Sequence, residues 1–564
     1  MSEQGCLMLL LGVLSSRRTL MMSRLMFCAT LLAAAATVSR AAAARPCSSL
    51  TALTLPNITI TSAIDVPAGI FTPPKEAGPT GLSRPAIVPA FCRVIGVARP
   101  TSDSVINFEV WLPVAQAWKG KFLGAGNGGY FGSISYGALA DALRRGYAAA
   151  STDTGHKGDD VKFAVGHPEK IIDWAYRGLH VTTAAAKLII RDYYGRFPRY
   201  AYFRGCSTGG EQGLNEAQRF PSDYDGIVAG DPGNNRTHLN TGFLWAYEAS
   251  HKNGASILPV DKLKLINKAA IAACDALDGI KDGIISDPRL CHFDPGTLQC
   301  HGANYSHCLS AEQVEAVRKI YEGARNPRTG EQIIPGYEPG SEFPANSQFG
   351  GWNTVFAGGS QPPRLDLWKY WVFDDPNWSW RTFDFDRDLA YADRKMAVLN
   401  AMSTNLAAFK ARGGKIVMYS GWADPIGPPQ DAINYYEAVT QTMGGPDKTV
   451  SFFRLFMVPG MSHCGGGPGP SPFGGAYGNN PASVKSSPEN DWLDALDRWV
   501  ERGIAPDQIV GSHLTHGVVD RTRPVCAYPK AAKWIGTGST DDARNFVCAV
   551  EDVTGLVSAS VKKR

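Results

Sequence analysis

The sequence is poor in charge and has no repeating pattern of glycine or proline. Asp, Glu, Lys and Arg make up 19% of its 564 residues, and their formal net charge is only +4. A balance this close to neutral excludes the basic footprint of a nucleic-acid-binding protein. The lack of a period excludes collagen-like and coiled-coil chains. With 44% hydrophobic residues, the chain is long enough for one large domain with an insertion, or for two domains.

The sequence also lacks an apolar run long enough to span a bilayer. The apolar stretch Leu25 to Val38 falls short of the roughly 20 residues that a membrane helix needs. Basic residues precede it, among them Arg17, Arg18 and Arg24, and alanines follow it before Arg45. This order is typical of an export signal that is removed, and the paired arginines also resemble a twin-arginine signal. We expect residues 1–44 to be cleaved from a secreted or periplasmic protein; the alternative is an uncleaved anchor helix.

No pair of cysteines has the CxxC spacing of a zinc site. Removal of residues 1–44 would delete four arginines, one glutamate and two cysteines, which takes the formal charge from +4 to +1 and leaves ten cysteines. An even number in an exported chain predicts disulfides. Pairing of near neighbours gives Cys47–Cys92, Cys274–Cys291, Cys300–Cys308 and Cys526–Cys548. Cys206 and Cys464 are left over, either as a fifth bond or as two buried thiols.

Strand-like and helix-like segments alternate at both ends of the chain, with a different pattern between them. Strands are expected over residues 105–112, 121–124, 147–152, 200–204, 226–229, 415–420 and 450–458, and helices over 173–193, 211–218 and 491–502. The middle has helical patterns at 260–277 and 310–323, then a stretch rich in Gly, Pro and Trp. This order predicts an α/β fold with a doubly wound sheet, whose catalytic domain comprises 45–235 and 400–564 and is interrupted by a lid at 236–399.

A serine follows one of the predicted strands in the sequence Gly205-Cys-Ser207-Thr-Gly209. G-x-S-x-G is the pattern of a nucleophile elbow, where small neighbours let the backbone turn sharply enough to expose the serine oxygen. The pentapeptide alone is weak evidence because glycine is common here. The strand before it and the helix after it favour a nucleophile over a plain glycine-rich turn.

A nucleophilic serine needs a histidine as base and an acid that orients the histidine. On this fold the acid and the histidine follow the serine in that order. Asp424 directly follows one late strand, and His463 follows the next in a glycine-rich loop. His513 and His516 lie in a less glycine-rich segment. We therefore predict Ser207, Asp424 and His463 as a triad, although any single Asp or His is more often a turn or cap residue.

The two unassigned cysteines adjoin members of this triad. Cys206 precedes Ser207 and Cys464 follows His463, so convergence of the triad would bring them within disulfide range. The developing oxyanion needs N–H donors. We nominate Thr208, directly after the serine, and Gly128 or Gly129 in the early glycine-rich stretch.

A second candidate site lies in the predicted lid. Asp275, Asp278 and Asp282 fall within eight residues, and the glycines between them permit tight turns. The carbonyls of Ile280 and Ile284 could join the carboxylates as hard oxygen ligands for calcium. From spacing alone, a solvated acidic turn is at least as good an interpretation.

Together these residues resemble the tannase and feruloyl esterase family. Cys206-Ser207, Asp424 and His463-Cys464 match its CS-D-HC pattern, and the resemblance covers about 45–550. It implies an α/β-hydrolase core with a lid, the triad named above, the other disulfides, Ca²⁺ at the five lid residues and no organic cofactor. It also implies hydrolysis of aromatic acid esters, among them feruloyl, gallate and mono-hydroxyethyl terephthalate esters, some attached to plant polysaccharide or polyphenol.

The predicted lid is rich in aromatic residues that could stack on a planar acyl group. We nominate Trp352 and Phe356 for the substrate pocket, with lid core as the alternative for each. We expect a feruloyl esterase-like serine carboxylesterase. The alternatives are a tannase, a terephthalate-type esterase, or a non-catalytic protein that binds carbohydrate or polyphenol.

Overall fold

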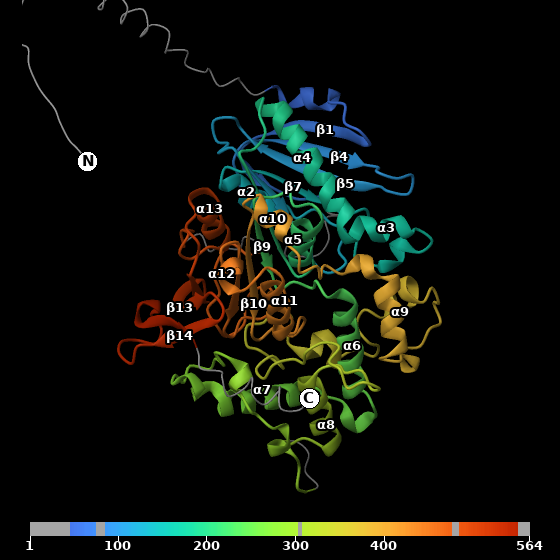
Figure 1. The fold of residues 1–564 in the computed structure, drawn as a ribbon, viewed down its shortest axis with the longest axis vertical. Coiled ribbons are helices and arrows are strands. Elements are labelled where there is room, and N and C mark those ends of the chain that lie inside the picture. Colours follow the sequence, from blue (N-terminus) through green and yellow to red (C-terminus); the bar gives the residue numbers. More distant parts are fainter. Residues whose placement is uncertain (1–44, 75–84, 303–306, 476–483, 551–564) are drawn as a thin grey trace, which may run out of the picture. The chain divides into compact units, whose positions relative to one another are not determined.

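The structure is a computed structural model that describes residues 45–74, 85–302, 307–475 and 484–550 (Figure 1). These residues belong to a single compact unit. No helix in the described ranges is long and apolar enough to cross a membrane. The predicted export signal, residues 1–44, lies outside them.

A nine-stranded mixed sheet forms the centre of this unit. The strands β1, β4, β5 and β7 pair antiparallel in that order, and the sheet then continues parallel through β6, β8, β9, β10 and β11. Their bounds are β1 Ile58–Val66, β4 Phe91–Ala98, β5 Ile106–Pro113, β6 Lys121–Ala125, β7 Ala148–Thr152, β8 Tyr200–Cys206, β9 Gly226–Gly230, β10 Lys415–Gly421 and β11 Phe453–Val458. The carboxyl ends of the parallel strands therefore share one edge.

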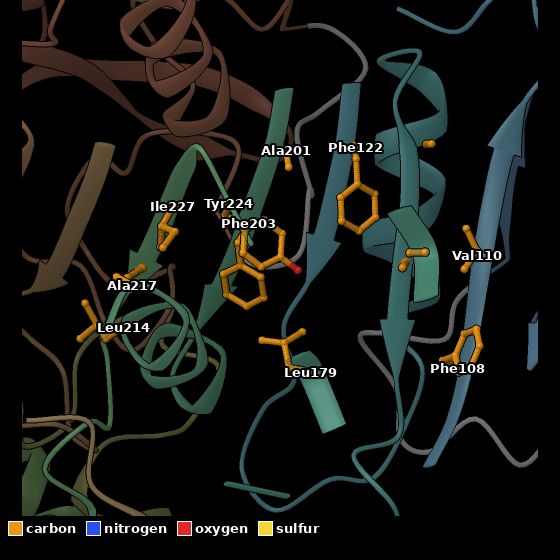
Figure 2. Packing of buried hydrophobic residues seen from close by; sticks show 14 of the residues in the cluster. Phe108, Val110, Phe122, Leu179, Ala201, Phe203, Leu214, Ala217, Tyr224 and Ile227 are labelled. Atoms are coloured by element: carbon orange, nitrogen blue, oxygen red, sulfur yellow. The ribbon is translucent and has the colours of Figure 1, made fainter. Parts of the chain in front are cut away.

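Helices cover both faces of this sheet, because its strands are apolar on both sides. Phe203 and Ile227 point to the face covered by α4 (Gly178–Tyr194), α5 (Thr208–Arg219) and α11 (Pro429–Thr442). Figure 2 shows Phe203 and Ile227 directed toward Leu214 of α5. The neighbouring residues Tyr202 and Val228 point to the other face, covered by α2 (Tyr136–Arg144) and α13 (Trp492–Arg502).

The segment between β9 and β10 adds no strand to this sheet in its described part. It holds the helices α6 (Arg236–Ser250), α7 (Val260–Cys274), α8 (Ala311–Glu322), α9 (Arg387–Lys395) and α10 (Ala407–Ala411). Leu263, Ile266, Val317 and Ile320 form part of its own buried cluster. The predicted boundaries, with a lid at 236–399 and a catalytic domain at 45–235 and 400–564, stay a prediction.

Shorter elements complete the unit. Three two-stranded sheets pair β2 with β3, β12 with β13, and β14 with β15. Their bounds are β2 Gly69–Phe71, β3 Ala86–Val88, β12 Gln508–Thr515, β13 Val518–Cys526, β14 Lys530–Trp534 and β15 Phe546–Val550. Two short helices, α3 (Pro168–Ile172) and α12 (Pro446–Val450), each begin at a proline, where the missing N–H is not needed.

Those two prolines explain where the predicted boundaries were wrong. The helix expected to open at Asp173 begins at Pro168, and Asp173 lies in a wider turn that joins α3 to α4. The strand expected from Val450 begins at Phe453, because α12 occupies the first of these residues. The predicted helix at 310–323 is present as α8, and Ser310 and Gln313 form a capping box at its start, with reciprocal side-chain bonds to the backbone.

All five predicted disulfides are present. The Cα–Cα separations are 5.0 to 5.9 Å, within the usual range for such bonds. Four of them close loops of 8 to 45 residues, whereas Cys206–Cys464 joins residues that are 258 positions apart. This long-range bond lies at the shared edge of the parallel strands.

Candidate active site

Ser207 occupies a strained turn between β8 and α5. Its φ and ψ are 62° and −123°, a combination that non-glycine residues adopt only where the surroundings impose it. Its N–H donates to the Gly230 carbonyl at 2.9 Å. A Cβ atom at Gly205 would lie 2.5 Å from the main chain of Gly209. The backbone therefore closes tightly here because both positions lack a side chain.

Asp424 and His463 meet at the ends of the two neighbouring strands. Asp424 follows β10, and its Oδ2 atom lies 2.6 Å from Nδ1 of His463, in the loop after β11. The Oδ1 atom of Asp424 accepts from the N–H groups of Ile426 and Gly427, at 2.7 and 3.1 Å. Both side chains are almost fully buried. This arrangement fixes the ring so that Nε2 is the nitrogen left for a proton transfer.

The inserted segment also contacts the histidine loop. Gln348 donates from Nε2 to the His463 carbonyl at 2.9 Å, and the hydroxyls of Ser347 and Ser462 are 2.7 Å apart. The ring of Phe349 packs edge-on against that of His463, with centroids 5.3 Å apart. Residues 347–349 of the inserted segment thus contact both the ring of His463 and the main chain of its loop.

The surroundings of His463 have opposing effects on its pKa. Burial lowers its pKa, whereas the charge of Asp424 and the hydrogen bond to it raise the pKa by more. The net pKa lies above the usual value for histidine. Such a ring is a stronger base than a free imidazole and is stabilised once it carries a proton.

Asp231, which was not nominated from the sequence, connects the loops that follow β10 and β11. It directly follows β9 with a φ of 33°. Its two carboxylate oxygens accept from the N–H groups of Gly421 and Cys464, at 2.8 and 2.7 Å. Burial raises its pKa, and the charge of Asp424 raises it further, to about 7. The available signal was the dipeptide Asp231-Pro232 after a strand, which parallels Asp424-Pro425.

The disulfide adds a covalent connection to the same place. Cys206 and Cys464 are bonded with their Cα atoms 5.9 Å apart, which brings the residue before Ser207 next to the residue after His463. Among the described residues no hydrogen bond joins the Ser207 hydroxyl to the His463 ring. Such bonds are often long without substrate and tighten in the substrate complex.

The glycine-rich loop predicted to supply oxyanion donors lies against Ser207. The Thr208 hydroxyl donates to the carbonyl of Gly129 at 2.7 Å, and the Phe131 N–H donates to the carbonyl of Gly128 at 3.0 Å. Gly129 has a φ of 53°, which favours glycine. Thr208 is the first residue of α5, where main-chain N–H groups have no partner within the helix. The structure thus brings Thr208, Gly128 and Gly129 together.

A buried arginine adjoins the same turn and was also missed. Arg236, the first residue of α6, donates to the Thr208 hydroxyl at 3.1 Å and pairs with Glu211 of α5. Both members of the pair are almost fully buried. Burial raises the pKa of Glu211 to about 7 although the charge of Arg236 opposes that shift. The sequence contains no local sign of this pair because its partners are 25 residues apart.

The acidic turn of the inserted segment is organised around Asp275. Its Oδ1 atom accepts from the N–H groups of residues 282, 283 and 284, at 2.9 to 3.2 Å. Gly279 and Gly283 have φ values of 86° and 82°, which allow the chain to curl around this carboxylate. Asp275, Ile280 and Ile284 are buried, whereas residues 276, 277, 279, 281 and 283 are exposed, so the turn is solvated on one side.

The other two carboxylates of this turn have partners of their own. Asp278 accepts from the Ile280 N–H at 2.9 Å and from the Ser286 hydroxyl at 2.6 Å, and Asp282 accepts from Arg523 at 2.7 Å. Within the described ranges, these three acids are not among the groups whose ligand atoms all lie within 4.8 Å of one another. The donor set of carboxylates and carbonyls fits the chemistry of Ca²⁺, although the three carboxylates would have to approach one another to share an ion.

Trp352 and Phe356, nominated for the substrate pocket, lie in the core of the inserted segment. They are 0% and 1% exposed and pack together with Tyr321 and Tyr337. The indole N–H of Trp352 donates to the Ser341 hydroxyl at 3.1 Å. Both residues therefore lie where the alternative interpretation, a role in the core of the lid, expects them. A side chain enclosed on all sides presents no face to a ligand.

The close approach at Gly205 gives a first prediction. Gly205→Ala places a methyl group against the main chain of Gly209, and we expect a loss of about 1–3 kcal/mol in the free energy of unfolding from overpacking. Urea denaturation measures this loss. The control is Gly254→Ala, where a Cβ meets nothing within 4 Å. Equal stabilities of the two variants would contradict the interpretation of a sterically closed turn.

Comparison with known proteins gives a consistent assignment. The family model described as tannase and feruloyl esterase matches residues 92–549. An uncharacterized esterase of Xanthomonas campestris pv. campestris is 43% identical over 553 residues, covering 92% of this chain and 94% of that protein. A probable feruloyl esterase B-2 of Aspergillus terreus is 33% identical over 509 residues, covering 88% and 93%.

Solved structures agree with this assignment. The crystal structure of feruloyl esterase B from Aspergillus oryzae superposes with a TM-score of 0.82 at 31% identity, covering 89% of this chain and 99% of that one. The tannin acyl hydrolase of Aspergillus niger shares the fold, with a TM-score of 0.69 at 22% identity and coverage of 90% and 94%. The fold is thus confirmed as an α/β-hydrolase. The chain belongs to the tannase and feruloyl esterase family and is a carboxylic ester hydrolase.

Proposed function

We propose that the protein is an exported serine carboxylesterase that hydrolyses esters of hydroxycinnamic acids through Ser207, His463 and Asp424. The observation that carries this proposal is the 2.6 Å contact between Asp424 and His463, in a loop bonded through Cys464 to the residue before Ser207. Five disulfides support an oxidising compartment. No helix in the described ranges is suited to cross a membrane.

In this mechanism the Ser207 oxygen attacks the ester carbonyl carbon while Nε2 of His463 accepts the serine proton. Asp424 holds the ring through Nδ1 and stabilises the charge that the ring acquires. The negative oxygen of the tetrahedral intermediate is bound by the N–H of Thr208 and an N–H of Gly128 or Gly129. His463 then donates its proton to the leaving alcohol. Water attacks the acyl-enzyme by the same route and releases the acid.

The choice of acyl group is supported by the relatives. One is named a probable feruloyl esterase B-2 and another is a crystallised feruloyl esterase B, both more than 30% identical to this chain. The tannin acyl hydrolase is 22% identical and shows the fold alone. A ferulate ester is therefore preferred to a gallate ester as the test substrate.

We expect the mature protein to hydrolyse methyl ferulate faster than methyl gallate or mono-hydroxyethyl terephthalate, as measured by release of the free acid. Ser207→Ala should lower kcat at least about 10⁴-fold because it removes the nucleophile. Ser48→Ala, at an exposed serine, is the matched control. Failure of the native protein to react with an active-site serine probe would favour a non-catalytic binding protein, and preference for gallate would make it a tannase.

Asp231 should act as a positioning residue for His463. In Asp231→Asn only one of its two N–H partners keeps an oxygen acceptor, so we expect kcat to fall roughly 10-fold, the worth of one hydrogen bond to a charged group. Because the negative charge of Asp231 raises the pKa of His463, the acid limb of kcat/KM should also move to lower pH. Asp388→Asn, at a buried acid of α9, is the control. An unmoved pH profile would reduce Asp231 to a purely structural role.

We also propose that the turn around Asp275 binds Ca²⁺ through Asp275, Asp278, Asp282 and the carbonyls of Ile280 and Ile284. The ion would have to bring the three carboxylates closer together. We expect chelation of calcium to lower Tm by roughly 2–5 °C, because a ligand that binds only the folded chain stabilises it. Added Ca²⁺ should restore Tm, but not in Asp278→Asn. Asp261→Asn, at an exposed acid of α7, should respond as the native protein does; an unchanged Tm on chelation would refute the site.

A further inference from the structure

A second cluster of potential metal ligands lies near the far end of the helix that begins after Ser207. Glu216 belongs to the last turns of α5, His180 to the first turn of α4, and Asp223 to the loop between α5 and β9. One ligand atom from each lies within 4.8 Å of the other two. Nδ1 of His180 and Oδ2 of Asp223 are 2.6 Å apart. None of these residues has a role in the proposed ester hydrolysis.

Glu216 is the unusual member of this cluster. It is 1% exposed, and both of its carboxylate oxygens are buried without a hydrogen-bond partner among the described residues. A buried carboxylate is normally paired or bound to a metal, because loss of its water is otherwise unfavourable. The carboxylate of Asp223 lies close to it, and repulsion between the two negative charges would make ionisation of both acids still less favourable.

The residues around the cluster do not supply the missing partner. The Lys187 ammonium donates to the main-chain carbonyls of Ser222 and Asp223 rather than to either carboxylate. The hydroxyl of Tyr224 lies 2.5 Å from that of Thr183. In Figure 2, Tyr224 is directed toward Phe203, within the apolar cluster under α5. The charge of Lys187 acts on Glu216 and lowers its pKa, but neither Lys187 nor Tyr224 donates a hydrogen bond to its carboxylate among the described residues.

The imidazole of His180 is held in a fixed orientation. It stacks on Phe220 with ring centroids 3.7 Å apart and an angle of 8° between the planes. Its side chain is 34% exposed, whereas that of Asp223 is 10% exposed, so the cluster is most open to solvent at the histidine. A cation has a route to the buried carboxylate, and water can complete its coordination from that side.

We propose that His180, Glu216 and Asp223 form a binding site for a divalent transition-metal ion, with Zn²⁺ as the ion that suits the donors best. One imidazole nitrogen, two carboxylates and a water give the four ligands that zinc takes in proteins. Bonds of about 2.0–2.1 Å place tetrahedral ligands roughly 3.3 Å apart. His180 and Asp223 therefore have to separate by less than about 1 Å. The site joins α4, α5 and the loop into β9, so its role is to stabilise the helix that carries Ser207 at its start.

The alternative is a proton shared between the two acids. Burial raises the pKa of Glu216 well above its usual value, and Asp223 raises it further, so without a cation the carboxyl holds a proton. Glu216→Gln separates the two cases. The amide has the shape and a donor group of the protonated acid, so this variant keeps the fold, but its neutral side chain is a poor ligand for a divalent ion.

The experiment titrates Zn²⁺ into mature protein that is free of transition metals, with Ca²⁺ kept saturating so that the acidic turn of the inserted segment does not contribute. Bound zinc per chain and Tm are both measured. The native protein should bind one equivalent more than Glu216→Gln, and zinc should raise its Tm by roughly 2–5 °C. Glu315→Gln, at an exposed glutamate of α8, should behave as the native protein.

His180→Asn is the second variant and should lose the same equivalent while its near-UV circular dichroism stays native. Zinc bound instead at Asp231, Asp424 and His463, whose ligand atoms also lie within 4.8 Å of one another, would inhibit ester hydrolysis and would persist in both variants. Equal zinc binding by the native protein and Glu216→Gln, or no binding by the native protein, would overturn the proposal and leave the shared proton as the explanation of this cluster.

Discussion

The convergence of three loops at one edge of the sheet is the constraint on which the site depends. Ser207, Asp424 and His463 follow different strands, and the proposed mechanism requires that their loops be fixed to one another. Two devices do this: the Cys206–Cys464 disulfide, and the carboxylate of Asp231, which accepts from the loops after β10 and β11. The covalent bond limits the separation of the loops, and the carboxylate sets their orientation. The strained backbone at Ser207 persists because the surrounding contacts prevent it from relaxing.

Much of this framework could be predicted from the sequence, because it depends on local patterns. Glycines around Ser207 and apolar runs before Ser207, Asp424 and His463 indicate strands that end at the proposed triad residues. Convergence of these three loops then offered Cys206 and Cys464, which near-neighbour pairing had left over, to each other as a fifth disulfide. The fold class and the five disulfides followed from the same reasoning and are confirmed. The antiparallel strands β1 and β4 were not predicted, although the first residues of β1 alternate between isoleucine and threonine.

What the sequence could not provide was the environment of isolated polar residues. Asp231, Glu211 and Glu216 resemble surface acids until the packing shows them buried. Arg236 meets Glu211 only because the start of α6 lies beside the first turn of α5. The aromatic residues of the inserted segment show the same limit for apolar side chains. Trp352 and Phe356 are aromatic residues that could stack on a ligand, yet each is enclosed by its neighbours. The sequence cannot separate these two roles, because burial in a core and contact with a ligand both favour an apolar side chain.

Although the chain contains few charged residues, several of its acids are buried. Their burial makes the stability of the fold depend on pH. Asp231 and Glu211 release their protons near pH 7 in the folded protein but near pH 4 in the unfolded chain. The folded state binds more protons between these values, so the free energy of unfolding falls as the pH rises through this interval. In the proposed mechanism a rise in pH has the opposite effect on activity, because His463 must be neutral to accept the Ser207 proton. The Cys206–Cys464 disulfide does not titrate in this pH range. It therefore keeps the two loops joined at the pH at which the buried acids ionise and the proposed base loses its proton.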